Sequence, residues 1–353
     1  MNTYILEDNL LISSPGVGGL TYLEGSNQIT ISTKASTGIY IGKEGLFCGL
    51  QENGGNHLIL AKDGASDDIE LANDALDIHD VLVHENLIYF VATQTNAVVC
   101  LNSDFKIVDS WQLSGEEDSS HINSVAVYKG RLIASAFGNF KLHREYKNGT
   151  QRLGRVFDVR TGETLIEGLS QPHSLTVENN YLYLCSSEEN TLHVYEDQTL
   201  IKSVLIPGYA RGVAVGEDYI YVGISLSRNV NSDISKLTSG AIAVIDKKTM
   251  IIVGLNMLPF REVYDIRIVN QHSNIFNLMQ LWQLDTQVLV DTLEKNKQEI
   301  ESQSNEIESQ SKEIEYLNNI IVEITSSKSW RITKPLRDIR SAFSMPSNKK
   351  IKE

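Results

Sequence analysis

Three histidines, an arginine and two aspartates stand out in this chain because they lie at or near the starts of short runs of alternating apolar residues. His79 begins the run HDVLV, His173 begins HSLTV and Arg211 begins RGVAV. A histidine can serve as a general base near neutral pH, and an arginine can stabilise a negative charge. Brought together by a fold, such residues can bind or convert an anionic ligand. The full set of candidate ligand-binding residues is His79, Asp80, His121, Asn123, His173, Arg211, Arg228, Tyr264 and Asp265.

These runs belong to an internal repeat. Its copies are TGIYIGKEGLFC from Thr37, HDVLVHENLIYF from His79, NSVAVYKGRLIA from Asn123, HSLTVENNYLYL from His173, RGVAVGEDYIYV from Arg211 and the shorter YDIRIV from Tyr264. With these first residues counted as position one, positions three, five and ten are Val, Ile or Leu in every copy that reaches them. Apolar alternation on both sides of a polar turn, such as Glu178-Asn179-Asn180, predicts a β-hairpin.

The spacing of the copies predicts a propeller. They start 42, 44, 50, 38 and 53 residues apart, and a four-stranded blade takes roughly 40–50 residues. The sixth copy lacks its second strand, whereas Asp8–Ser14 matches that strand and Leu20–Leu23 and Gln28–Ser32 supply two more. We therefore expect an all-β, six-bladed propeller over residues 1–271 that is closed by its amino-terminal strands. An all-β solenoid is the competing architecture, but it would not need this split blade.

The repeat also predicts where a site would form. In a propeller the inner strand of each blade starts at one mouth of the central channel, so the position-one residues should ring that mouth. They are Thr37, His79, Asn123, His173, Arg211 and Tyr264. Two long loops, Asn139–Gly154 and Leu226–Gly240, should lie on the same face, where loops on a rigid scaffold commonly carry binding residues. Their cationic residues are Lys141, His143, Arg144, Lys147 and Arg152 in the first and Arg228 and Lys236 in the second. The competing explanation is that a His or Asp at a strand start only bonds to backbone.

The composition and the charge distribution restrict the classes of partner that the protein can bind. The formal net charge is −14, but residues 326–353 carry +6, which leaves −20 on the remainder. An acidic body argues against nucleic acid as a partner. No run of about 18 apolar residues is present, and the first residues lack the pattern of a signal peptide. The three scattered cysteines, Cys48, Cys100 and Cys185, are typical of reduced core thiols in a cytoplasmic protein. No motif identifies a metal or a cofactor.

A helical segment is expected after the propeller, over residues 274–325. Isoleucine recurs every seven residues at Ile300, Ile307, Ile314 and Ile321. Such a heptad predicts self-association through a coiled coil, although Gln303 and Gln310 weaken the second core position. A single exposed helix is the alternative.

The last segment, residues 326–353, contains the motif S-x-SWR-x-T-x-PLR. Its matching residues are Ser329, Trp330, Arg331, Thr333, Pro335, Leu336 and Arg337. This segment resembles one that follows coiled coils in bacterial glycosyltransferases and other proteins of surface-polysaccharide synthesis. The resemblance covers about ten residues and implies a pathway rather than an activity. Physically, Trp330 and Leu336 can anchor an amphipathic element on an anionic membrane or an acidic protein, which would place the protein at the inner membrane's cytoplasmic face. A disordered basic tail is the alternative.

The propeller segment also resembles an uncharacterised bacterial family of six-bladed propellers, a domain of unknown function. The matching stretches are 171–174, 208–215 and 222–228, which read QPHS, GYARGVAV and VGISLSR. The resemblance implies the fold and no substrate.

Four functional hypotheses follow. The preferred one is a binding or scaffold module in cell-surface polysaccharide assembly, whose propeller mouth holds a glycan, a nucleotide-sugar or a protein. The second is a propeller hydrolase or lyase with His79 or His173 as general base and Arg211 as the anion-stabilising group. The third is a divalent metal held by His79, Asp80, Asn123 and Asp265. Glycosyltransferase activity is disfavoured because the chain has no G-x-G-x-x-G motif or βαβ pattern.

Overall fold

The computed structural model describes residues 5–51, 57–62, 65–71, 77–226, 237–269 and 272–343. Side chains are described in these ranges except at 65, 66, 272–294, 296, 299 and 340–343. The chain divides into two units, residues 1–284 and 285–353.

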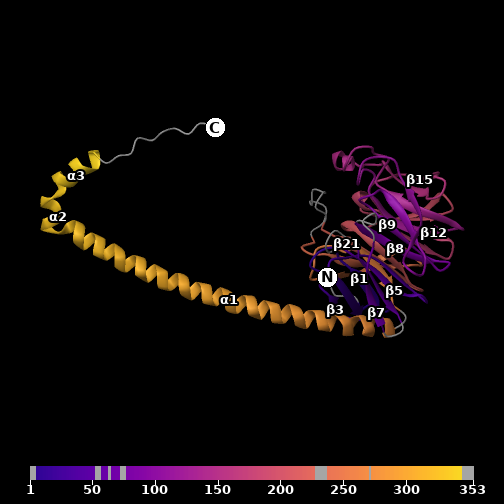
Figure 1. Ribbon diagram of the computed structural model, residues 1–353. Coiled ribbons are helices and arrows are strands. Elements are labelled where there is room, and N and C mark those ends of the chain that lie inside the picture. The colour runs from indigo at the N-terminus through magenta and orange to yellow at the C-terminus, as the bar shows by residue number, and fades with distance from the viewer. Residues whose placement is uncertain are drawn as a thin grey trace. The chain divides into compact units, whose positions relative to one another are not determined.

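The first unit is a six-bladed antiparallel β-propeller, as the repeat predicts (Figure 1). Three blades consist of β4 (Ser36–Gly42), β5 (Gly45–Leu50), β6 (His57–Lys62) and β7 (Ala65–Glu70); of β8 (Ile78–His84), β9 (Leu87–Ala92), β10 (Ala97–Leu101) and β11 (Ile107–Gln112); and of β12 (Ile122–Tyr128), β13 (Arg131–Ala136), β14 (Gly154–Asp158) and β15 (Thr164–Leu169). Two more consist of β16 (Pro172–Glu178), β17 (Tyr181–Ser186), β18 (Thr191–Glu196) and β19 (Thr199–Leu205), and of β20 (Tyr209–Val215), β21 (Tyr219–Ser225), β22 (Ala241–Asp246) and β23 (Ile251–Met257).

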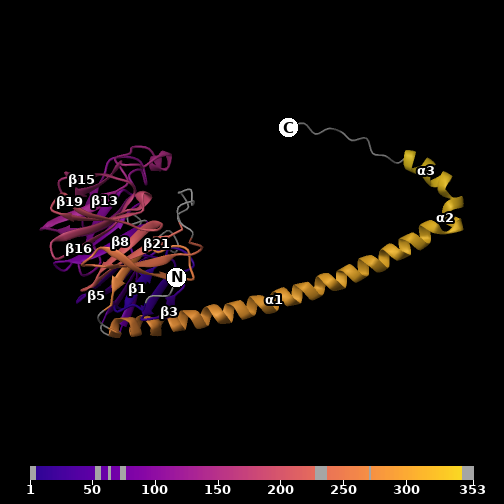
Figure 2. The ribbon, with the colours of Figure 1, turned by 180° about the vertical axis from the view of Figure 1, so that it is seen from behind.

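The sixth blade joins the two ends of the propeller segment. Its strand order is β24 (Asp265–Ile268), β1 (Leu10–Ser13), β2 (Leu20–Glu24) and β3 (Asn27–Ser32). β24 and β1 pair antiparallel, from Leu10 opposite Ile268 to Ser13 opposite Asp265. The indigo start of the chain and the orange end of the propeller accordingly lie side by side in both ribbon views (Figures 1 and 2). The predicted closure is therefore present, and β24 contacts both of its neighbours in the ring, β20 and β4.

The repeat positions have the packing roles that their apolar character implies. Every position-three side chain is at most 4% exposed, and so is every position-ten side chain. Each core cluster combines side chains from two adjacent blades, so burial holds neighbouring blades together. The polar turn predicted at 178–180 is a two-residue loop, because Glu178 still pairs with Tyr181. Asn179 and Asn180 have φ of 48° and 67°, the left-handed pair that matches the twist of a hairpin.

The second unit is helical. α1 (His272–Ser326) begins in the first unit and ends in the second, and α2 (Lys328–Ile332) and α3 (Lys334–Phe343) follow it. The Ser327 side chain caps α2 by accepting a hydrogen bond from the Trp330 backbone N–H. A C-terminal helix is thus confirmed, whereas the coiled coil and the partners of the basic segment remain predictions. Among the described helices, none combines the length and the apolar character needed to span a membrane.

Deletion of residues 1–25 should abolish cooperative folding, because it removes β1 and leaves the backbone of β24 without its partner. Thermal denaturation and size-exclusion chromatography would show a broad, early transition or aggregation. Two point variants make a matched pair. Ile12→Ala, at a fully buried site, should lower the free energy of unfolding by about 2–5 kcal/mol. Val17→Ala, at a site that is 92% exposed, should leave it almost unchanged. A truncated chain that melts like the full chain would show that the closure is dispensable.

Candidate functional site

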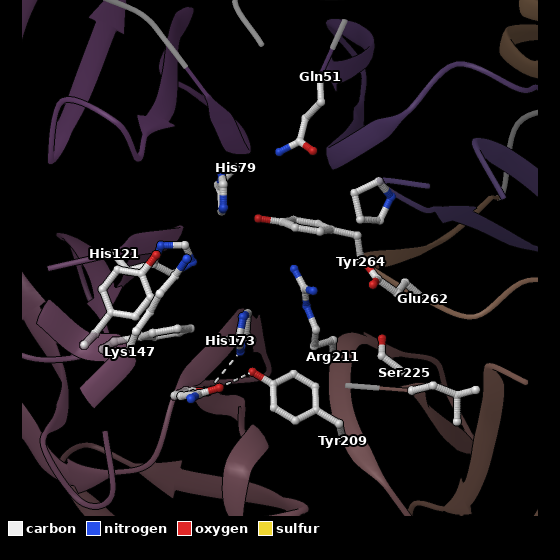
Figure 3. Close-up of a pocket in the computed structure, with 15 residues that line it drawn as sticks. Gln51, His79, His121, Lys147, His173, Tyr209, Arg211, Ser225, Glu262 and Tyr264 are labelled. Atoms are coloured by element: carbon white, nitrogen blue, oxygen red, sulfur yellow. Dashed lines mark hydrogen bonds between the residues drawn. The ribbon is translucent and has the colours of Figure 1, made fainter. Parts of the chain in front are cut away.

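A cavity of about 350 Å³ lies at the channel mouth where the inner strands begin. Five of the sequence-predicted residues line it together, and Figure 3 shows them around a common space: His79, His121, His173, Arg211 and Tyr264. Asp80, Asn123 and Asp265 instead line a narrow space of about 10 Å³, which His79, His173 and Tyr264 also border. Arg228, the remaining candidate, lies outside the described residues, as does Lys236.

Each of the three mouth histidines is fixed through its Nδ1 atom. His173 Nδ1 lies 2.9 Å from the Gln171 backbone oxygen and 2.8 Å from Ser187 Oγ. His79 Nδ1 lies 3.1 Å from the Asp77 backbone oxygen, and His121 Nδ1 lies 2.8 Å from Asp118 Oδ1. A carbonyl oxygen or a carboxylate can only accept, so Nδ1 carries the hydrogen in each ring. In the neutral tautomer Nε2 is then left as a hydrogen-bond acceptor.

Burial keeps two of these rings neutral. It lowers the pKa of His173 well below the ordinary value, and the charge of Arg211 lowers it further. Burial also lowers the pKa of His121, although its hydrogen bond to Asp118 works in the opposite direction. At neutral pH both rings therefore offer an uncharged acceptor rather than a positive charge.

Arg211 and Tyr264 leave hydrogen-bonding capacity unused. The Arg211 guanidinium carbon lies 4.2 Å from the centroid of the Tyr264 ring, a cation–π contact. The Arg211 Nε atom and the Tyr264 hydroxyl are buried, and neither has a hydrogen-bond partner among the described residues. In Figure 3 the Tyr264 hydroxyl points toward His79, and the guanidinium lies beside the Tyr264 ring. Buried polar groups are nearly always paired in native proteins, so these two are available to a ligand.

The first long loop is fastened to the mouth by Asp118, which is 2% exposed. Its Oδ2 accepts hydrogen bonds from Arg144 Nε at 2.7 Å and from the Tyr146 hydroxyl at 2.8 Å. These donors and His121 hold the pKa of Asp118 down, at about 2, against the effect of burial. Of the five cationic residues of this loop that the sequence places at the mouth, only Lys147 lines the cavity. Arg144 is instead paired with Asp118.

Position two of the repeat has a different role from position one. Asp80 accepts a hydrogen bond from the Val125 N–H of the next blade, and Asp265 accepts one from the Ile39 N–H, each at 2.9 Å. Ser124 and Ser174 likewise accept from the backbone N–H groups of Leu175 and Gly212. In five blades the pairing register of the inner strand shifts next to position one. A β-bulge changes the direction in which a side chain points. Here the Asp or Ser side chain at position two accepts a hydrogen bond from the neighbouring blade.

Asp80 and Asp265 form a buried pair that shares one cation. Arg267 Nη2 lies 3.0 Å from Asp265 Oδ2 and 3.8 Å from Asp80 Oδ1. Burial, and then the charge of Asp265, raise the pKa of Asp80 to about 7, although Arg267 opposes this shift. The pKa of Asp265 is raised too, chiefly by burial. Within the described ranges no three His, Cys, Asp or Glu side chains gather as metal ligands, and the oxygens of these two carboxylates already accept backbone hydrogen bonds.

Several cavity residues are ones that the repeat pattern did not single out. Gln171, Tyr209 and Glu262 each precede a position-one residue by two, as His121 does. The same two-residue offset in four copies is a usable sequence signal, although only Tyr209 of the four lies in the same strand as its position-one residue. Gln51, Phe137 and Leu226 follow the ends of second strands, which lie beside the starts of inner strands in a hairpin. Tyr146 comes from the long loop, and nothing in its local sequence indicates that it reaches the mouth.

The two carboxylates Asp80 and Asp118 should titrate with opposite effects on stability. For Asp80 the native pKa exceeds the unfolded value of 3.8, so the native state binds more protons between pH 4 and 7. The stability of the wild type relative to Asp80→Asn should therefore rise as the pH falls from 8 to 4, by at most about 1.4 kcal/mol per pH unit for one proton. Chemical denaturation across this pH range measures it.

Asp118→Asn is the matched control. Because the native pKa of Asp118 is about 2, its stabilising contribution is present above 3.8 and is lost as the pH falls from 4 toward 2. The same sign of pH dependence for both variants would contradict the assigned electrostatics.

Comparisons with known proteins agree with the fold. A chain of the crystal structure of a nidogen/laminin complex is 10% identical, with a TM-score of 0.53 over 74% of this chain and 97% of that one. A protein of unknown function from Bacteroides caccae is also 10% identical, with a TM-score of 0.54 over 75% of this chain and 99% of that one. At this identity the likeness concerns the fold alone. No curated protein matches the chain.

A family model describes most of the propeller. It matches residues 68–278, which run from the fourth strand of one blade through β24 and into α1. The match covers more than half of the chain. This chain therefore belongs to the family described as a domain of unknown function, DUF4915.

Proposed function

We propose that this protein is a binding module whose propeller mouth holds an anionic, hydroxyl-rich ligand such as a glycan or a nucleotide-sugar. The observation that carries the proposal is the pair of unbonded polar groups in the cavity, Arg211 Nε and the Tyr264 hydroxyl. Leaving a buried donor without a partner costs about 1–3 kcal/mol. Asp118 at the mouth instead uses both of its carboxylate oxygens in hydrogen bonds, so the two unsatisfied groups of the cavity suit a ligand that supplies acceptors.

The Arg211→Ala variant tests the proposal. It should lose binding of the ligand at least tenfold, equivalent to about 1.4 kcal/mol. The melting temperature without ligand should change little, because the substitution removes a cation–π interaction with Tyr264. Such an interaction contributes about 0.5–1 kcal/mol at a partly exposed site. Thermal melts with a panel of acidic sugars, sugar phosphates and sugar nucleotides measure both quantities.

Arg155 provides a matched control. Its Nε is also buried and has no hydrogen-bond partner in the described part of the chain, and its guanidinium lies 4.8 Å from the Phe157 ring centroid, but Arg155 is not among the residues that line the mouth. Arg155→Ala should keep the ligand-dependent rise in melting temperature. A wild-type protein that responds to no member of the panel, or an Arg211→Ala variant that responds fully, would refute a binding role for the mouth.

A hydrolase or lyase is the second candidate, and the histidine geometry favours it over other enzymes. His79 and His173 each carry the hydrogen on Nδ1, so Nε2 can accept a proton from a substrate. Arg211 would then stabilise the negative charge that develops. Mass spectrometry of each bound ligand after incubation separates the candidates: a binding module returns it unchanged, and an enzyme converts it.

We also propose that the helical segment self-associates through Ile300, Ile307, Ile314 and Ile321. These side chains are 55–66% exposed in the single chain, although isoleucine at a heptad position is ordinarily buried against a partner helix. Replacing Ile307 and Ile314 by Asp should give a monomer with an intact propeller. Light scattering measures the mass, and the propeller's melting transition reports its folding.

Ser302→Asp with Ser309→Asp adds the same charge at outer heptad positions, two residues after the isoleucines, and should leave the oligomer intact. Equal masses for the wild type and the isoleucine variant would refute the coiled coil.

We further propose that the basic segment docks on anionic lipid or an acidic partner at the cytoplasmic face of the inner membrane, in surface-polysaccharide synthesis. The support is an amphipathic pattern: Ile332, Leu336 and Ile339 are 57–77% exposed beside basic residues. Arg337 covers one face of Trp330, its guanidinium carbon 3.5 Å from the ring centroid. The three free, buried cysteines fit a reducing compartment.

Co-sedimentation with anionic vesicles tests the docking. Each basic residue near an anionic surface contributes on the order of 1 kcal/mol, so binding should weaken steeply as salt is raised. Leu336→Asp should reduce binding at every salt concentration, whereas Ser329→Asn should not. Binding to neutral vesicles alone, or the absence of binding to vesicles and to acidic proteins, would favour a tail with no docking role.

A further inference from the structure

The proposed binding site can be narrowed to one chemical class of ligand by counting its donors, acceptors and charges. Three groups of the mouth differ in what they offer: a guanidinium, a tyrosine hydroxyl and three imidazole rings. What each can bond, and the size of the cavity, restrict the ligand more tightly than its negative charge alone.

The positive charge of the site is small. Among the described residues that line the cavity, the cations are Arg211 and the exposed Lys147, and Glu262 opposes them. His121 and His173 add no charge, because burial lowers their pKa values. A diphosphate group brings about two negative charges and needs several cationic or N–H donors around it. One buried guanidinium matches a group with a single negative charge.

The geometry of Arg211 suits a planar anion. Tyr264 lies against the guanidinium at 4.2 Å, while the buried Nε edge carries no hydrogen bond among the described residues. A guanidinium edge presents two parallel N–H groups, which match the two oxygens of a carboxylate. The Tyr264 hydroxyl, which points toward His79 in Figure 3 and has no partner among the described residues, can add a third hydrogen bond.

The histidines of the mouth favour a ligand that carries hydroxyl groups as hydrogen-bond donors. Because Nδ1 of His121 and His173 carries the hydrogen, each of these two neutral rings presents Nε2 as an acceptor. Acceptors repel the oxygens of a phosphate, which are acceptors themselves, but they bond the hydroxyl groups of a sugar. The aromatic rings of Phe137, Tyr146 and Tyr209 provide apolar walls for the C–H face of a sugar ring.

We infer that the mouth cavity binds a sugar acid, that is, a hydroxylated ring with one carboxylate, of the uronic acid type. Arg211 receives the carboxylate, Tyr264 donates to it, and the histidine Nε2 atoms accept hydrogen bonds from ring hydroxyls. The cavity volume of about 350 Å³ lies at the small end of the range of roughly 300–1,000 Å³ for small-molecule sites, as a ligand of one or two sugar rings requires. This inference rests on the proposed binding function and specifies its ligand.

Calorimetric titration of the full chain with four matched probes tests it. The probes are glucuronate, glucose, glucose 1-phosphate and uridine diphosphate glucose, which differ in the charged group. Glucuronate should bind at least tenfold more tightly than glucose, which lacks the carboxylate, and more tightly than either phosphorylated probe. Arg211→Gln should weaken the binding of glucuronate at least tenfold and leave the affinity for glucose unchanged. Arg155→Gln should change neither affinity.

Tyr264→Phe is the second variant, in case Arg211→Gln fails to fold, because it removes one hydroxyl and keeps the ring. It should weaken the binding of glucuronate and leave the affinity for glucose unchanged. Tighter binding of a phosphorylated probe would overturn the sugar-acid assignment while leaving the proposed binding function in place. Binding of none of the four, together with no response to the wider panel of acidic sugars, would overturn both.

Discussion

The rest of this fold depends on how the inner strand of each propeller blade satisfies its backbone hydrogen-bonding groups. This strand pairs with a neighbouring strand on one side only, so the backbone groups on its other side face the channel and the next blade. In four of the six blades the side chain at position two supplies the missing partner, and in the other two this position is glycine. Asp80 bonds Val125 N–H, Ser124 bonds Leu175 N–H, and Asp265 bonds Ile39 N–H. Each such bond joins one blade to the next, so satisfying the backbone also fixes the blades around the ring.

This division of roles frees position one for the ligand site. In five blades the register shift beside position one turns the following residue toward the neighbouring blade. Four position-one side chains, those of His79, His173, Arg211 and Tyr264, line the mouth cavity. The two sets of side chains are adjacent in sequence and differ in chemistry: position two is engaged in fixed hydrogen bonds, whereas Arg211 and Tyr264 at position one have unused donors. Asp118 completes the frame, since it orients His121 and holds the Arg144 and Tyr146 side chains of the long loop.

Much of this architecture is predictable from the sequence because apolar alternation and repeat spacing are local signals. The six blades and the completion of the last blade by β1 follow from them. The site is predictable only in part. His79, His173 and Arg211 do share a cavity with Tyr264, but Asp80 and Asp265 accept hydrogen bonds from the neighbouring blades. Beside Asp80 the strand register shifts, and no residue type in the sequence indicates such a shift. The sequence predicts that Arg144 is a cation of the channel mouth, but its side chain is paired with the Asp118 carboxylate, 26 residues earlier. Nothing in the local sequence indicates this ion pair, because only folding brings the two residues together.

The way the last blade is shared has a consequence for synthesis on the ribosome. β1 is made early, but its partner β24 follows only after residue 264. At roughly 5–20 residues per second, the interval between them lasts on the order of 13–50 s. Throughout that time one edge of the first sheet is without its inner strand, while the other five blades are completed in order. The growing chain therefore presents an open strand edge until the end, and this interval is when it most needs protection by a chaperone.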